Sequence, residues 1–272
     1  MEIESWIIFA TETLAKAGSE TARLDSLVLI EDVLGKDRSW LLAHPTDSIS
    51  KKDLNMLNKF IVQRSNHYPV AYITHKAYFY NNQFYVDNHV LVPRPESEAI
   101  IDVLKTLPSS NLATIIDIGT GSGVIAITAK LLYPKSTVFA LDIDTQCLKV
   151  ARKNALSTKT DITFLQSDLL ESLPANLAYS SIVLANLPYV PDGFAVNRSA
   201  RLEPKLAIFG GSKGLDVYSR LFQQIVALTT KPAHVITESF PVQHPQLQSI
   251  AWQAGYSCQA TNDFIQLFSL PA

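Results

Sequence analysis

The chain is poor in the residues on which several protein classes depend. Its 272 residues include two cysteines, Cys147 and Cys258, which are too few for a disulfide framework or a cysteine-rich metal site. We expect both to be buried free thiols. None of the six histidines falls in an H-x-x-x-H spacing, so we expect no metal in the catalytic centre.

Long apolar runs and an excess of positive charge are also missing. No run approaches the about 18 apolar residues of a membrane helix, and the acidic start Met1–Glu4 lacks the basic flank of a signal peptide. The formal net charge of −2 provides no overall basic field for nucleic acid. We therefore expect a cytoplasmic, monomeric protein that binds neither membranes nor nucleic acid.

What is present indicates a globular chain of more than one part. Residues 1–76 carry helix signals: Ser50 and Asp53 form a capping box, Thr21 can cap a second helix, and Gly35 can end it. Chemical motifs are absent from this stretch. We interpret residues 1–76 as a helical domain that recognises the substrate.

The pattern then changes twice. In residues 77–92, aromatic and β-branched residues surround Asn81-Asn82 and Asp87-Asn88, which predicts a β-hairpin linker. In residues 93–272, short apolar strands alternate with helices, as in parallel βαβ units. The expected strands are 113–118, 138–142, 162–165, 182–185, 234–238 and 264–270, and the expected helices are 97–107, 124–132, 145–156 and 215–228. The fold class is therefore α/β, with a doubly wound, mostly parallel sheet.

A glycine-rich turn follows the first of these strands. It reads D-I-G-T-G-S-G, and glycine lets the backbone turn tightly and approach a ligand. A dinucleotide fingerprint would need its third glycine where Val124 stands, so the spacing favours S-adenosylmethionine. A glycine turn without a ligand is the alternative. The candidate cofactor-binding residues here are Asp117, Gly119, Thr120, Gly121, Ser122 and Gly123.

Acidic residues follow the next two strands. Asp142 can accept hydrogen bonds from both ribose hydroxyls. Asp144 is a rival for that role, but its position favours a helix cap. After the third strand, Asp168 can accept from an adenine amine and Leu169 can pack on the purine, although Asp168 could instead cap a helix.

The segment Asn186-Leu187-Pro188-Tyr189 follows the fourth strand. The oxygen of the Asn186 side chain can accept one N–H of an NH₂ group, and a backbone carbonyl of the turn can accept the other. Tyr189 can stack on a planar group. This pattern favours a planar nitrogen substrate aimed at the methyl sulfonium, with positioning as the main catalytic effect. We take Asn186, Pro188 and Tyr189 as candidate catalytic residues and place Asn186 beside the cofactor too; an ordinary Asn-Pro turn is the alternative.

Together these motifs resemble the HemK/PrmC family, which methylates the glutamine side-chain amide of peptide chain release factors. Leu91–Glu98 is similar to its L-I-P-R-P-E-T-E, Asn186–Tyr189 to its N-P-P-Y, and Glu203–Leu215 to its E-P-x-x-A-L-x-G-G-x-D-G-L. The resemblance implies a class I methyltransferase domain that converts S-adenosyl-L-methionine to S-adenosyl-L-homocysteine. It also implies that a glutamine-bearing loop of a release factor is the partner. Substrate contacts would come from Arg94, Pro95, Glu96, Asn186, Leu187, Pro188 and Tyr189.

The chain departs from the family pattern at several positions. Leu187 replaces a proline, Lys213 stands for an aspartate, and Phe240 stands for a glycine. The usual basic stretch near the end is absent from residues 263–266. Because Leu187 keeps its carbonyl and Pro188 biases it toward an extended backbone, we expect a divergent but active member.

Two other functions remain open from the sequence. An adenine methyltransferase acting on RNA or DNA would use similar NH₂ recognition, with Arg94, Arg152 and Lys153 available for phosphates. The net charge and the lack of an aromatic-basic stripe argue against it. A non-catalytic module that binds a translation partner is the other alternative, and the presence of Asn186 and Tyr189 argues against that.

Overall fold

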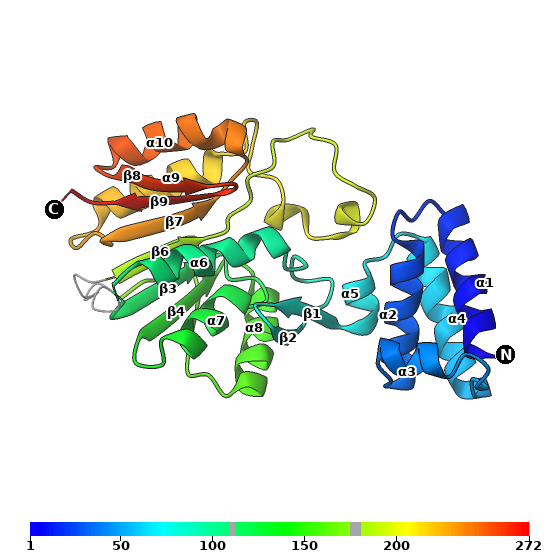
Figure 1. The fold of residues 1–272 in the computed structure, drawn as a ribbon. Helices are drawn as coiled ribbons and strands as arrows, with labels where there is room; N and C mark the ends of the chain where they lie inside the picture. Colours follow the sequence, from blue (N-terminus) through cyan, green and yellow to red (C-terminus); the bar gives the residue numbers. More distant parts are fainter. Residues whose placement is uncertain (109–111, 175–180, 272) are drawn as a thin grey trace. The chain divides into compact units, whose positions relative to one another are not determined.

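The computed structural model describes residues 1–108, 112–174 and 181–271 (Figure 1). The chain forms two compact units. The first combines Met1–Lys76 with Val196–Leu202, and the second combines Ala77–Ala195 with Glu203–Ala272. Within the described ranges, no helix is both long and apolar enough to span a bilayer.

The first unit is helical, as predicted. Its helices are α1 (Ile3–Lys16), α2 (Ala22–Leu34), α3 (Arg38–Ala43), α4 (Lys51–Ser65) and α5 (Val70–Thr74). Their apolar faces bury Trp6 and Leu14 in one core. The Ser50 hydroxyl accepts the Asp53 N–H at 3.2 Å and so caps α4 as expected. Thr21 was predicted to cap α2, but its hydroxyl donates to Asp25 instead of accepting from the backbone.

A short segment from late in the sequence completes this unit. The Arg64 guanidinium pairs with Asp25 at 2.7 Å and donates to the Ser199 hydroxyl at 2.9 Å. Arg198 lies 3.0 Å from the ring nitrogen Nε2 of His67. Residues 196–202 are therefore bound to the helices by side-chain hydrogen bonds.

The second unit is built on a seven-stranded sheet in the order β5-β4-β3-β6-β7-β9-β8. Its strands are β3 (Thr114–Ile118), β4 (Thr137–Asp142), β5 (Thr163–Gln166), β6 (Ser181–Ala185), β7 (His234–Glu238), β8 (Ser257–Asn262) and β9 (Ile265–Ser269). The first five run parallel, and β9 lies antiparallel between β7 and β8. The predicted mostly parallel sheet is confirmed.

Helices cover both faces of this sheet (Figure 1). One face packs against α6 (Glu98–Thr106), α7 (Val124–Leu132) and α8 (Thr145–Thr158). The other packs against α9 (Asp216–Ala227) and α10 (His244–Gln253). Strands β3 and β6 are buried along their whole length, which explains their uninterrupted apolar sequence.

The predicted β-hairpin is present but shorter than expected. It consists of β1 (Lys76–Phe79) and β2 (Asn82–Tyr85). Tyr80 and Asn81 have φ of 49° and 63°, the left-handed conformation that a two-residue hairpin turn requires. Phe79 and Phe84 are buried in the core that α6 and α7 share, so the hairpin is packed into the second unit.

The strand order reverses beside β3. The chain leaves β3 toward β4 and β5, then returns to β6 on the opposite side of β3. At this reversal Ile118 and Ala185 pair at the carboxyl ends of the two strands. Ligands of open α/β sheets bind at such a switch point, and both predicted motifs begin there.

Candidate active site

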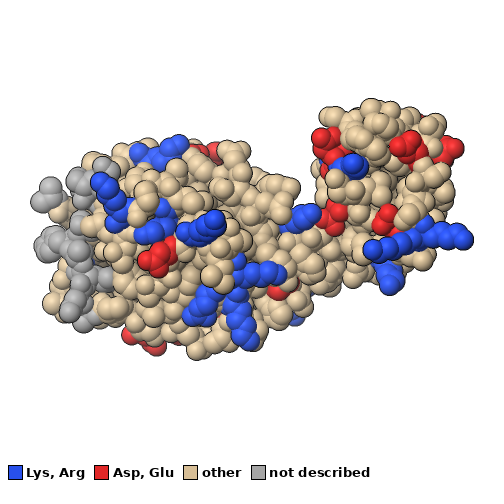
Figure 2. All heavy atoms as spheres, turned by 90° about the horizontal axis from the view of Figure 1, so that it is seen from below, with Lys and Arg blue, Asp and Glu red and all other residues tan. Residues whose placement is uncertain are grey.

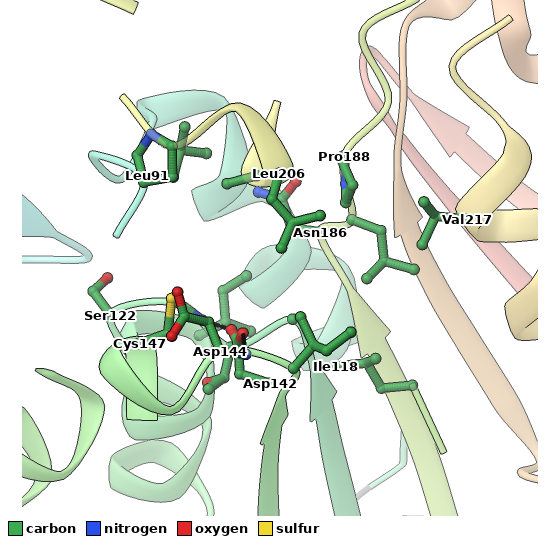
Figure 3. Close-up of a pocket in the computed structure, with 18 of the residues that line it drawn as sticks. Leu91, Ile118, Ser122, Asp142, Asp144, Cys147, Asn186, Pro188, Leu206 and Val217 are labelled. Carbon is green, nitrogen blue, oxygen red and sulfur yellow. Dashed lines mark hydrogen bonds between the residues drawn. The ribbon is translucent and has the colours of Figure 1, made fainter. Parts of the chain in front are cut away.

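A cavity opens at the carboxyl ends of β3, β4, β5 and β6, and residues of the second unit alone line it. Figure 3 shows Ser122, Asp142, Asp144 and Cys147 on one side and Asn186 opposite. Most of the predicted site residues reach its wall: Arg94, Gly119, Thr120, Gly121, Ser122, Asp142, Asp168, Leu169, Asn186, Leu187 and Pro188. Asp117, Gly123, Tyr189, Pro95 and Glu96 do not.

The glycine turn needs its glycines for two different reasons. Gly119, Gly121 and Gly123 have φ of 68°, 53° and 82°, which other residues rarely adopt. A Cβ on Gly119 would lie 3.0 Å from the Leu187 side chain, at the cavity. A Cβ on Gly123 would lie 3.0 Å from Ala151, so this glycine allows α7 to approach α8.

Asp117 supports the turn from beneath. Its Oδ2 accepts the Thr120 hydroxyl at 2.6 Å and the Ala126 N–H at 3.2 Å. Burial raises the pKa of this carboxyl to about 7, against the hydrogen bonds that lower it. The predicted residue therefore shapes the loop from outside the cavity wall.

Asp142 joins two loops at the cavity. Its Oδ2 accepts the Gly121 N–H at 2.9 Å, and its Oδ1 accepts the Asp144 N–H at 2.9 Å. Each carboxylate oxygen has a second lone pair, so further acceptor capacity remains. Burial raises the pKa of Asp142. Asp144 caps α8 by accepting from the Gln146 N–H, as expected.

Asp168 and Leu169 follow β5. The carboxylate of Asp168 forms an ion pair with Arg220 of α9, and no helix begins beside it within the described residues. Leu169 has φ of 54° and is buried at the cavity wall. Arg220 was not predicted, because nothing local marks a residue 52 positions from its partner.

The backbone of residues 185–190 is held on several sides. The Tyr218 hydroxyl lies 2.6 Å from the Glu238 carbonyl oxygen and 3.0 Å from that of Ala185, the two acceptors for its one proton, and it accepts the Leu187 N–H at 3.3 Å. Gln243 donates to the Tyr189 carbonyl at 2.8 Å. Among the described residues the Leu187 carbonyl has no hydrogen-bond donor, so it is available to a ligand.

Two glycines press against the same turn. A Cβ on Gly210 would lie 2.2 Å from the Pro188 carbonyl oxygen, and a Cβ on Gly214 would lie 2.0 Å from that of Tyr189. Neither space can hold a side chain. The G-G-x-x-G-L segment noted in the sequence therefore fits closely around the turn.

The side chains of the turn are fixed from other elements. The Asn186 amide nitrogen Nδ2 donates to the Ser97 hydroxyl at 2.8 Å, which leaves its oxygen Oδ1 for a ligand. The Tyr189 hydroxyl donates to Oε1 of Glu238 at 3.0 Å, and its ring meets Phe240 edge-on at 5.0 Å. Tyr189 thus packs behind the wall of the cavity instead of forming it.

The segment around Arg94 is anchored by a residue that the prediction did not select. Arg94 pairs with Glu203 at 2.6 Å, and the Val92 N–H donates to the same carboxylate at 3.0 Å. Glu203 is buried. Pro95 and Glu96 are exposed at the start of a short 3₁₀ turn.

The cations that the nucleic-acid alternative would use have partners of their own. Arg152 lies over Phe164 at 5.6 Å and Lys153 over Tyr85 at 3.0 Å from the ring centroids. On the face in Figure 2, Lys and Arg side chains are spread in small groups among neutral and acidic residues. The two cysteines are free, as expected, but half-buried rather than buried.

Residues 5–74 match the PrmC N-terminal domain family, and residues 97–199 match the methyltransferase small domain family. A release factor glutamine methyltransferase of Koribacter versatilis is 34% identical over 79% of this chain and 78% of its own length. The chain belongs to the release factor glutamine methyltransferase family. A relative of the same name from Bacillus subtilis is 31% identical over 85% of this chain and 82% of its own length.

Solved structures agree on the fold. A methyltransferase from Pyrococcus furiosus covers 82% of this chain and is itself covered completely, at 15% identity and a TM-score of 0.51. The T. Thermophilus 16S rRNA N2 methyltransferase RsmC, solved with AdoMet and guanosine, covers 72% of this chain and is covered over 50% of its length, at 18% identity and a TM-score of 0.53. The predicted family, fold and enzyme class are confirmed: this member is an S-adenosylmethionine-dependent methyltransferase.

Proposed function

We propose that the chain transfers a methyl group from S-adenosylmethionine to the side-chain amide nitrogen of a glutamine in a peptide chain release factor. The observation that carries the proposal is the orientation of Asn186. Its Nδ2 is bound to Ser97, so its oxygen is left to accept an N–H at the end of β6. An NH₂ group fits this acceptor and the Leu187 carbonyl, and the similarity to release factor glutamine methyltransferases favours a glutamine amide over an adenine amine.

The cavity suits the methyl donor. The backbone of Gly119–Ser122 surrounds it without bulky side chains, and Asp142 keeps acceptor capacity for the ribose hydroxyls. We assign Asp168 and Leu169 to the adenine. Asp117 and Gly123 act through the loop that they shape. When bound, S-adenosylmethionine supplies an electrophilic methyl group on a sulfonium.

The substrate amide needs help because its nitrogen lone pair is delocalised into the carbonyl. Asn186 Oδ1 and the Leu187 carbonyl accept its two N–H groups, which orients the nitrogen and stabilises the positive charge that develops on it. Such positioning contributes up to ~7–11 kcal/mol in favourable cases. Pro188 keeps the turn stiff, and Tyr189 supports it from behind. The amide proton leaves after transfer, so no strong base is required.

Arg94, Pro95 and Glu96 complete the proposed substrate contacts. Arg94 reaches the cavity wall, whereas Pro95 and Glu96 lie exposed beside it in the chain. We assign them to the edge of the site, where a glutamine-bearing loop enters. Because the ion pair with Glu203 fixes Arg94, this edge is preformed.

We assign recognition of the release factor to the helical unit. Several of its large apolar side chains are exposed: Ile8, Phe9, Leu24, Leu42, Met56 and Val62. Exposed apolar groups favour a protein partner, and the net charge of −2 disfavours a nucleic acid. We propose that the protein acts in the cytoplasm as a monomer.

The direct test is to incubate the purified protein with a release factor and S-adenosylmethionine and to analyse the product by mass spectrometry. We expect one added methyl group on a glutamine side chain. Methylation of adenine in RNA or DNA, with the release factor unchanged, would instead favour the nucleic-acid function. Cofactor binding without transfer to any of these would indicate the non-catalytic module.

A further inference from the structure

Glu238 is a buried carboxyl in contact with Tyr189, and the proposed mechanism assigns no role to it. It ends β7 and is 1% exposed. Oε1 accepts the Tyr189 hydroxyl, whereas Oε2 is buried without a hydrogen-bond partner in the described part of the chain. Burying a carboxylate oxygen without a hydrogen-bond donor costs free energy. A nearby hydroxyl that turns to donate to this oxygen would offset that cost.

Ser97 is that hydroxyl. It is 3% exposed, and its oxygen already accepts Nδ2 of Asn186. Ser97 is near enough to the Glu238 carboxyl to favour its ionised form and lower the pKa, although its hydroxyl forms no hydrogen bond with Oε2 in the structure. A serine hydroxyl has one proton to donate. That proton is free for Glu238 because Asn186 acts as donor to Ser97.

The charge of Glu238 sets the direction of this chain of hydrogen bonds. An ionised carboxylate can only accept. Asn186 donates to Ser97, so a Ser97 hydroxyl that turns to Glu238 can only donate to it, and the Asn186 oxygen is left facing the cavity. If these hydrogen bonds ran in the opposite direction, Asn186 would present its NH₂ group to the NH₂ group of the substrate.

We propose that Glu238 is a positioning residue, which orients the Asn186 amide through Ser97 and holds Tyr189 through a direct hydrogen bond. The inference rests on the proposed function, because it matters for a substrate that donates N–H groups. Glu238 acts without touching the substrate. It links the two predicted motif side chains to one buried anchor on the neighbouring strand.

The charged neighbours of Glu238 predict how pH acts on this anchor. Burial raises its pKa, and the charge of Glu96 raises it further, whereas Ser97, Tyr189 and Arg94 lower it. A protonated Glu238 carboxyl can donate to Ser97, and Ser97 can then donate to the Asn186 oxygen, which reverses the direction of the hydrogen bonds. The turnover rate should therefore fall as pH falls through the raised pKa, and Glu238→Gln should lack this acid limb.

A double-mutant cycle tests the orientation directly. Glu238→Gln places an NH₂ group against Ser97 and should lower kcat for release factor methylation by ~10-fold or more, within the ~10²–10³ range typical of one preorganised hydrogen bond. The KM for S-adenosylmethionine should not change. Asn186→Asp presents an oxygen in either orientation, so adding Glu238→Gln to it should lower kcat little further. Ser97→Ala breaks the chain at its middle and should show the same coupling to Asn186→Asp.

Thr237→Val is the matched control. Thr237 is the preceding residue of β7, fully buried, with an unpartnered hydroxyl in the described part of the chain, and its side chain points to the other face of the sheet. We expect wild-type kcat from it. Wild-type kcat in Glu238→Gln, or equal losses from Glu238→Gln in the wild-type and Asn186→Asp backgrounds, would overturn the inference alone. An inactive wild-type enzyme would overturn the proposed function as well, so the two failures are distinguishable.

Discussion

Oδ2 of Asp142 accepts the backbone N–H of Gly121 at 2.9 Å. This contact joins the end of β4 to the glycine turn that follows β3. It gives Asp142 two effects on the cofactor site, because the same carboxylate lines the cavity and holds the neighbouring loop. A substitution of Asp142 therefore removes a proposed ligand contact and a support of the loop together.

Asp142→Ala should weaken binding of S-adenosylmethionine. Each charge-assisted hydrogen bond lost is typically worth ~1.5–3 kcal/mol, and the release of Gly121 adds to the loss. Isothermal titration calorimetry measures the effect. Asp37→Ala is the control, because Asp37 caps α3 in the helical unit and its loss should lower stability with little change in affinity. Unchanged affinity in Asp142→Ala would exclude the ribose role.

Asp117 predicts a pH dependence of stability. Its pKa rises from 3.8 to about 7 in the folded protein. A carboxyl with a raised folded pKa stabilises the fold below its unfolded pKa, and this contribution is lost as pH rises through the folded pKa. Relative to Asp117→Asn, the wild-type free energy of unfolding should fall between about pH 4 and pH 7, by up to ~4 kcal/mol. Urea unfolding of both proteins, measured at each pH, would show this fall. A difference in the free energy of unfolding that stays constant across pH would contradict the raised pKa.

Gly210→Ala should damage the Asn186–Tyr189 turn. Its Cβ would meet the Pro188 carbonyl oxygen at 2.2 Å, so either the turn or the facing loop must move. We expect a large fall in kcat and only a modest fall in the melting temperature. Gly193→Ala is the control, since it has a left-handed φ of 80° but open space around it and should cost ~1 kcal/mol of stability. Equal activities of the two variants would show that the close fit is not needed.

The helical unit requires a test that keeps it intact. Because Val196–Leu202 packs into this unit, deleting residues 1–76 would remove the support of that segment as well as the proposed docking surface. Substituting exposed Ile8 and Phe9 with serine avoids this. We expect the KM for the intact release factor to rise several-fold, while methylation of a short glutamine peptide is unchanged. The control Leu156→Ser alters an exposed apolar residue of the second unit. Equal effects on both substrates would contradict the docking role.

Patterns within short stretches of sequence predicted the elements whose structure depends on neighbouring residues. The continuous apolar strands β3 and β6, the N-cap at Ser50 and the glycine turn all appear where expected. Strand β8 was missed because its residues are mostly exposed and polar; it forms by pairing with β9. Helix α10 carries no strong amphipathic signal and was missed as well.

The contacts between distant residues could not be predicted from one sequence. Asn186 and Ser97 are 89 positions apart, and Arg94 and Glu203 are 109 apart. Ser97 and Glu203 were noted as parts of motifs, but their roles depend on the register of strands and loops that only the folded chain defines. Tyr189 shows the converse: its position suggested stacking, and the fold turns its hydroxyl to Glu238.

The central claim is that the Asn186 oxygen holds the glutamine amide for attack on the methyl group. The decisive measurement is kcat of Asn186→Ala for release factor methylation, with cofactor affinity measured alongside. We predict a fall of ~10²–10³-fold with little change in affinity, and a smaller loss in Asn186→Asp, which keeps an acceptor of the same shape. A near wild-type kcat in Asn186→Ala would contradict the account.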